Sequence, residues 1–333
     1  MRQSRDSEVC YTGVVPAVPG ERPDRAELVV TESLDGARLD KATVQLAAGT
    51  LSRAKVKRAI DAGEVRVNGR RRPKGALVAK GDRITLEGLA AESDESAVPD
   101  PSAPLEVRFE SSEVIVVDKP AGQPTAPLRP GEKGTLANAL LARYPELAGI
   151  GYVPREPGLV HRLDTDTSGL VVVARTPAAF ERLKSALKEG RITKHYLLVC
   201  EGEGLADDGT IAFPIASHPK DQRRVLACIH PRDVMRNSPR PASTSFHVRE
   251  RGAKYALVEV EVSRAIRHQI RAHFAAIDHP LVGDSLYGGA SVEGLGRHAL
   301  HASRVAHDGG GDVALRFAVE SPLPDELARL VAS

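Results

Sequence analysis

The sequence has few cysteines and no long apolar segment. Its three cysteines, Cys10, Cys200 and Cys228, are odd in number, far apart and outside any Cys-x-x-Cys pair, which argues against a disulfide framework and a zinc site. No apolar run approaches the roughly 20 residues that span a bilayer, and no apolar signal segment follows the first residues. These absences predict a cytoplasmic protein without a membrane span, a disulfide framework or a metal site.

A small net charge hides an uneven distribution of charge. The 333 residues carry a formal net charge of +2, yet residues 35–87 hold 13 Lys and Arg against 6 Asp and Glu, while the rest of the chain holds 33 against 38. A local concentration of this kind is typical of a module that contacts phosphate groups. The overall composition, 41% hydrophobic and 27% charged, is that of an ordinary globular protein with a sizeable core.

Composition and length together predict two domains. Residues 1–27 contain three prolines and no helical or strand period, which indicates a mobile tail. Residues 88–104 are rich in proline and acidic residues and poor in large apolar side chains, which is typical of a linker. The basic module therefore spans 28–87, and the larger second domain spans 105–333.

Within the basic module the pattern predicts two short helices and a hairpin. Ser52 is a plausible N-cap of the second helix, in which Val56 and Ile60 fall on one side and basic side chains crowd the others. Asn68-Gly69 follows an alternating strand and is a strong hairpin signal. The alternative to a binding face is a merely solvated basic surface.

The stretch 160–170 is the centre of the second domain. It reads Val-His-Arg-Leu-Asp-Thr-Asp-Thr-Ser-Gly-Leu and precedes the apolar run 171–174. Polar, reactive side chains beside a β-branched strand predict a loop that delivers them to a cleft, with Asp164 as the catalytic candidate. The plain alternative is a turn that Asp164 only caps, and spacing alone leaves the two interpretations about evenly balanced.

Further patterns lie on both sides of this loop. A Lys-Pro-x-Gly turn occupies 119–122, and Lys194 and Tyr196 are two apart on a predicted strand, hence on one face. A strand tyrosine is otherwise most often a packing residue. Residues 263–274 read as a basic helix whose two histidines, five apart, do not form a metal pair, and Gly-Asp-x-x-Tyr-Gly follows at 283–288.

These blocks resemble a known family. His-Arg-Leu-Asp-x-x-Thr-Ser-Gly-Leu at 161–170 looks like the signature of the RluA/RluC/RluD-type pseudouridine synthases of ribosomal and transfer RNA, and the other blocks stand in the family's order from about 105 to 330. The module 28–87 resembles the S4-like, or alpha-L, RNA-binding motif. Two departures stand out: Thr125-Ala126-Pro127 where many members have His before Pro, and Ala265-Ile266-Arg267 where members have Gly-Arg-Thr.

The resemblance implies a fold and an activity. The fold would be α+β, with a central mixed, mostly antiparallel sheet and the active cleft across its face, plus a small N-terminal α/β S4-like domain. The activity would be isomerisation of specific uridines in structured RNA to pseudouridine. Because this reaction involves no redox change and no group acceptor, it would need no cofactor, and the target base would have to leave the stack.

The resemblance also assigns roles to residues. Asp164 would attack ribose carbon 1 or remove the neighbouring ribose proton, Arg271 would hold Asp164 ionised and aimed, and Tyr196 would stack on the base and serve as a candidate base at carbon 5. Arg162 would fill the gap left by the flipped nucleotide. The complete set of RNA-binding candidates is Arg162, His161, Lys194, Arg38, Ser52, Arg53, Lys55, Lys57, Arg58 and Asn68.

Several alternatives stay open at this point. A metal-dependent hydrolase using Asp164, Asp166 and His161 has a weak ligand set. A catalytically silent ribosome assembly factor could keep the fold. Ribosomal RNA, most plainly of the large subunit, is the expected substrate and transfer RNA the alternative. The expected state is a monomer. The sequence does not tell which uridine is modified or what Arg267 does. It also does not decide whether Asp164 acts as the nucleophile or, in the competing glycal mechanism, as the base toward the ribose proton.

Overall fold

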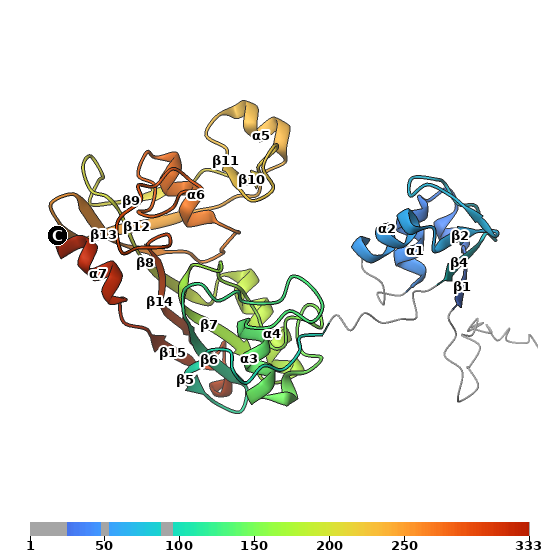
Figure 1. The fold of residues 1–333 in the computed structure, drawn as a ribbon, viewed down its shortest axis with the longest axis horizontal. Helices are drawn as coiled ribbons and strands as arrows, with labels where there is room; N and C mark the ends of the chain where they lie inside the picture. Colours follow the sequence, from blue (N-terminus) through green and yellow to red (C-terminus); the bar gives the residue numbers. More distant parts are fainter. Residues whose placement is uncertain (1–24, 48–52, 88–95, 333) are drawn as a thin grey trace, which may run out of the picture. The chain divides into compact units, whose positions relative to one another are not determined.

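The computed structural model describes residues 25–47, 53–87 and 96–332. It divides the chain into two compact units, one within residues 1–93 and one within 94–333 (Figure 1). Each unit has its own apolar core. We therefore describe the two units separately.

The first unit is a four-stranded antiparallel sheet with two helices. Its strand order is β1-β4-β2-β3. The elements are β1 (Arg25–Val29), α1 (Leu39–Leu46), α2 (Arg53–Ala62), β2 (Val65–Val67), β3 (Arg70–Arg71) and β4 (Arg83–Glu87), with a 3-10 turn at Glu32–Leu34. The predicted tail boundary at 27 was wrong, because residues 25–27 already pair with β4, a long-range contact that local periodicity cannot reveal.

The two predicted helices and the hairpin of this unit are present. Val56 and Ile60 of α2 are buried in the core, as their spacing indicated. Asn68 and Gly69 both have positive φ, 50° and 76°, and connect β2 to β3. The Asn68 side chain donates to Asp82 Oδ1 at 2.8 Å and accepts from the backbone of Arg83 at 2.9 Å, so it stabilises the turn.

The second unit is built on one large mixed sheet. Its strand order is β5-β6-β7-β14-β8-β13-β12-β9, with β15 paired to β14. The β14–β7 pair is parallel and the other pairs of this sheet are antiparallel, so the predicted mostly antiparallel α+β fold is confirmed. The strands are β5 (Glu106–Glu110), β6 (Val114–Lys119), β7 (Ser168–Ala174), β8 (Thr193–Glu201), β9 (Asp208–Ile211), β12 (Thr244–Arg251), β13 (Tyr255–Glu261), β14 (Leu300–His307) and β15 (Phe317–Glu320).

Helices flank this sheet, and a small lobe stands off it (Figure 1). The helices are α3 (Leu136–Arg143), α4 (Pro177–Glu189), α6 (Gln269–Ala276) and α7 (Asp325–Ala332), with 3-10 turns at Pro145–Leu147 and Val313–Leu315. The lobe comprises β10 (Ile215–Ser217), β11 (Val225–Ala227) and α5 (Pro231–Asn237). Thr135 starts α3 with a capping box to Asn138, which satisfies amide groups that a helix start leaves free.

Two predictions of local structure were wrong in the second unit. Residues 97–103, assigned to the linker, pack on this unit: Ala97 is buried in its core, and Asp100 accepts a hydrogen bond from the backbone of Gly134 at 3.0 Å. Residues 88–95 lie outside the described residues. The basic helix expected from 263 begins only at Gln269, because His268 adopts a left-handed conformation with φ 54° that interrupts the turn.

The sheet positions the loop 160–167 at the cleft. All seven residues of β7 are buried, so this strand fixes the end of the loop in the core. Gly169 allows the close approach of β14, because a Cβ there would lie 2.3 Å from the backbone oxygen of Ala302. The loop therefore emerges from rigid structure immediately before the polar residues that the sequence singled out.

Candidate active site

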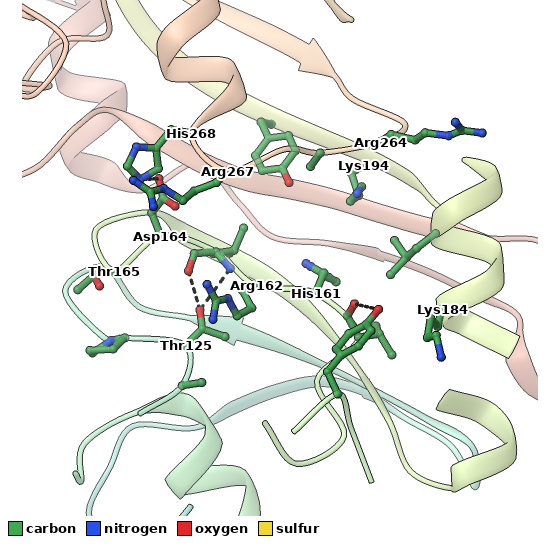
Figure 2. A pocket seen from close by; sticks show the side chains of 18 of the residues that line it. Thr125, His161, Arg162, Asp164, Thr165, Lys184, Lys194, Arg264, Arg267 and His268 are labelled. Atoms are coloured by element: carbon green, nitrogen blue, oxygen red, sulfur yellow. Dashed lines mark hydrogen bonds and ion pairs between the residues drawn. The ribbon is translucent and has the colours of Figure 1, made fainter. Parts of the chain in front are cut away.

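A cleft of about 950 Å³ lies over the loop 160–165 (Figure 2). Its walls come from this loop, from α4, from β8 and from the segment before α6. Seven Lys or Arg side chains line it against two acidic ones, Glu132 and Asp164. A concave surface with this charge balance attracts a polyanion. The lining cations are Arg162, Lys184, Lys188, Lys194, Arg240, Arg264 and Arg267.

The centre of the cleft floor is an ion-paired chain of three residues. Asp164 Oδ2 accepts from Arg271 at 2.9 Å, and Arg271 in turn donates to both carboxylate oxygens of Asp284 at 2.7 and 2.8 Å. Burial alone would lower the pKa of Arg271, but the carboxylates of Asp284 and Asp164 raise it above its ordinary value. The predicted pairing of Arg271 with Asp164 is therefore present, and Asp284 orients the guanidinium.

His268 and Tyr287 complete the surroundings of Asp164. The His268 Nε2 lies 3.5 Å from Asp164 Oδ2, and its Nδ1 lies 3.1 Å from the Tyr287 hydroxyl. Burial lowers the pKa of His268, although Asp164 opposes this shift. The Tyr287 ring contacts the guanidiniums of both Arg271 and Arg224, each 5.2 Å from its centroid. One tyrosine thus connects the Asp164 site with the lobe that carries Arg224.

Tyr196 lines a smaller cavity beneath the cleft. This cavity, about 110 Å³, is also lined by Asp164, Val262, Ile270 and Arg271. Its apolar side chains and the aromatic ring suit a planar base, and its volume is comparable to one pyrimidine ring. Burial first, and the charge of Asp164 second, raise the pKa of the Tyr196 hydroxyl, so the phenol stays protonated at neutral pH.

Two residues that sequence reasoning did not assign to the site hold its loop. The Lys119 side chain is fully buried, and its Nζ donates to the backbone oxygens of Pro120, Gln123 and Thr165 at 2.8 to 2.9 Å. The Thr125 hydroxyl donates to the oxygen of Leu163 at 2.7 Å and accepts from its amide at 3.2 Å. Lys119 belongs to the Lys-Pro-x-Gly turn and Thr125 to the departure noted above, so both carried a signal.

We expect Lys119→Met to lower both stability and turnover. The variant leaves three backbone carbonyls without their donor, and a buried group left unsatisfied costs about 1–3 kcal/mol. It also frees the backbone beside Asp164. Chemical denaturation and single-turnover kinetics measure the two effects. Lys188→Met on α4, an exposed lysine of the same cleft, is the control for loss of charge. Full turnover at unchanged stability in Lys119→Met would show that the loop does not need this anchor.

Two RNA-binding candidates of the loop have internal partners. His161 Nε2 accepts from the amide of Val172 at 3.0 Å, and burial together with the charge of Lys194 lowers the pKa of His161 to about 3. The neutral ring therefore fixes the loop to β7. Arg162 reaches from the cleft floor to Glu156, at 2.9 Å, and its side chain is 57% exposed.

The candidates of the first unit are mostly at its surface. Arg38 pairs with Asp40 at 2.8 Å and remains about half exposed. On α2, Lys57 and Arg58 are exposed and Lys55 is half-buried. Ser52 lies outside the described residues, and of Arg53 only its place at the start of α2 is described. Asn68 serves the hairpin, as shown above.

Arg267, whose role the sequence left undecided, does not pair with Asp164. Its guanidinium donates to the backbone oxygen of Gln222 in the lobe at 2.7 Å. Within residues 25–47, 53–87 and 96–332, no group of three or more His, Cys, Asp or Glu side chains is arranged to hold a metal ion. No helix of these same segments is long and apolar enough to cross a membrane.

Comparisons with known proteins agree with this geometry. The family model of RNA pseudouridylate synthase matches residues 113–276. The ribosomal large subunit pseudouridine synthase D of Nitrosomonas europaea is 36% identical over 93% of this chain and 88% of its own length. The uncharacterized RNA pseudouridine synthase YlyB of Bacillus subtilis is 33% identical over 92% and 97%. The structure of human RNA pseudouridylate synthase domain containing 1 covers 67% of this chain and 85% of its own, with 26% identity and a TM-score of 0.53.

Proposed function

The chain belongs to the RNA pseudouridylate synthase family, and from this premise we propose that it isomerises specific uridines of large-subunit ribosomal RNA. The observation that carries the proposal is the Asp164–Arg271–Asp284 chain on the floor of a basic cleft. The name of the relative from Nitrosomonas europaea favours ribosomal over transfer RNA as substrate, because the similarity covers nearly the whole chain.

The geometry supports a division of roles in the reaction. Asp164 would act at the ribose, either as the nucleophile toward carbon 1 or as the base toward the neighbouring proton. Arg271 would keep its carboxylate ionised and aimed. Tyr196 would stack on the base in the small cavity, and its protonated phenol favours this role over proton removal at carbon 5. Arg162 would have to leave Glu156 to fill the gap of the flipped nucleotide.

Carbodiimide mapping of pseudouridines tests the proposed substrate. RNA is compared between cells with this protein, cells without it, and cells that carry Asp164→Asn instead. We expect one or a few sites in large-subunit ribosomal RNA to vanish in the second and third strains. Lost sites in transfer RNA alone would reassign the substrate. No lost site would contradict the proposed activity.

We also propose that the first unit, as an S4-like module, supplies affinity for RNA. On α2, Lys57 and Arg58 are exposed and Lys55 is half-buried, whereas Val56 and Ile60 face the core. Each phosphate contact contributes a slope of about −0.7 to −0.9 in log affinity against log salt. The triple change of Lys55, Lys57 and Arg58 to Gln should therefore weaken binding and flatten the slope by about 2 to 3, while turnover at saturating RNA persists.

A matched triple variant controls for loss of charge. Lys254, Arg316 and Arg329 are exposed in the second unit and do not line the cleft. Their change to Gln removes the same three charges and should leave the salt slope within about one unit. Equal slopes for the two triple variants would mean that α2 is only a solvated surface.

A further inference from the structure

Lys194 is a buried cation for which the structure offers no carboxylate. The residue is 6% exposed. Among the described residues no side chain shifts the pKa of Lys194 through a hydrogen bond or charge, since burial is the one cause of the shift. The Lys194 Nζ is not among the fully enclosed unpaired atoms of these residues, and the side chain lines the cleft. Burial lowers the pKa of Lys194 to about 8, so the side chain is still mostly charged at neutral pH. A poorly hydrated ammonium without a carboxylate partner is stabilised by an anion that binds beside it.

The groups around Lys194 are cationic or neutral. His161 from the loop, Arg264 from the segment before α6, and Lys184 from α4 line the same cleft (Figure 2). Lys188 of α4 lines it too. The Tyr196 hydroxyl, on the same strand, is protonated. None of these described groups is an anion.

The two carboxylates of the cleft already have partners. Asp164 pairs with Arg271 at 2.9 Å. Glu132 accepts from the backbone amides of Leu128 and Arg129 at 2.7 and 3.1 Å. Neither is free to neutralise Lys194, so the missing anion must come from the substrate.

The position of Lys194 along β8 specifies which part of the substrate it meets. Lys194 and Tyr196 point to the same face of β8, about 7 Å apart along the strand. Tyr196 and Asp164 both line the small cavity that, under the proposed function, accepts the base. A nucleotide with its base on Tyr196 and its ribose at Asp164 extends its backbone along the cleft. A step of about one nucleotide brings a phosphate to Lys194.

We propose that Lys194 binds the phosphodiester group beside the target uridine. This inference rests on the proposed function and names the contact that places the ribose over Asp164. Lys194 would differ from the rim cations of the cleft, because its charge is desolvated before binding and so interacts more strongly with a bound phosphate. Binding would also hold the Lys194 proton, which the free enzyme begins to lose near pH 8.

The test measures binding and stability in three variants of the full chain. All carry Asp164→Asn, so that RNA is bound without conversion, and the probe is the large-subunit RNA fragment that the wild type modifies. Lys194→Met removes the charge, Lys194→Arg keeps it at all working pH values, and Lys254→Met is the control at an exposed lysine that does not line the cleft.

We expect opposite effects on binding and stability in Lys194→Met. Affinity should fall about tenfold or more, as for loss of a charged hydrogen bond, while the melting temperature should rise because an unpaired buried charge is gone. Lys254→Met should lose less than about threefold. Between pH 6.5 and pH 9 the RNA affinity of the Asp164→Asn parent should fall about tenfold more than the affinity of the Lys194→Arg variant. This difference follows from a pKa of about 8 for Lys194.

Two results would overturn the proposal. Unchanged affinity in Lys194→Met, with or without lower stability, would make Lys194 a structural residue. Equal pH dependence in the parent and Lys194→Arg would show that its proton is not coupled to RNA. Failure of the wild type to modify any RNA would instead contradict the proposed function, so the two failures are distinguishable.

Discussion

Asp164→Asn should abolish pseudouridine formation while RNA binding survives. The substitution keeps the size of the side chain and one oxygen that can accept from Arg271, 2.9 Å away in the native protein, but it removes the charge that the reaction needs at the ribose. Loss of the central catalytic group lowers turnover by about three orders of magnitude or more. Release of tritium from base carbon 5 under single-turnover conditions measures the loss.

The same loop provides a matched control. Asp166 is also a carboxylate, two residues further on, and its side chain is exposed. Asp166→Asn therefore removes the same charge from the same loop without touching the Arg271 pair, and it should retain turnover within about threefold. If Asp164→Asn also kept activity within about tenfold of the wild type, Asp164 would not be the catalyst.

Arg271→Ala should cost both activity and stability. The Asp284 side chain, only 1% exposed, would lose its guanidinium partner, and breaking a buried ion pair in this way costs about 3–5 kcal/mol. Asp164 would lose the group that aims it, so turnover should fall by about two orders of magnitude or more. Arg271→Lys should lose about as much activity as Arg271→Ala but a smaller part of the stability. An ammonium cannot reproduce the fork of the guanidinium toward both carboxylates.

A double variant separates the two effects of Arg271→Ala. Adding Asp284→Asn removes the unpaired buried charge, so part of the stability should return while activity does not. Arg267→Ala is the control, because this neighbour donates only to the backbone of Gln222 and should stay within about tenfold of the wild type. Recovery of activity in the double variant would mean that Arg271 acts through the fold and not through Asp164.

The sequence was informative where one strand or helix carries the signal. The buried run of β7 and the Lys-x-Tyr face of β8 are local patterns, and the structure has both. The lobe gave no such signal, because α5 is seven residues long and buries none of them, and β10 and β11 have three residues each. No element of the lobe was predicted for this reason, and β9 and β12 were not predicted either.

Contacts between distant segments account for the rest. Asp284 lies 13 residues from Arg271, and Lys119 lies 46 residues from Thr165, so only the folded sheet brings them together. The left-handed His268 was likewise invisible in a pattern that reads as helix from 263. Local periodicity thus predicted the elements, and the family resemblance singled out Asp164 and its partner Arg271. The roles of Asp284 and Lys119 required the tertiary structure.

The way the catalytic loop is held has a consequence for how its sequence can vary. Lys119 contacts the oxygen of Thr165, Thr125 contacts the amide and oxygen of Leu163, and Arg297 donates to the oxygen of Asp166. These contacts grip the main chain, and a main-chain group is the same whatever side chain it carries. The exposed side chains of Thr165 and Asp166 can therefore be substituted without moving Asp164. Substitution of Lys119, Thr125 or Arg297, which hold the loop from outside, would move it.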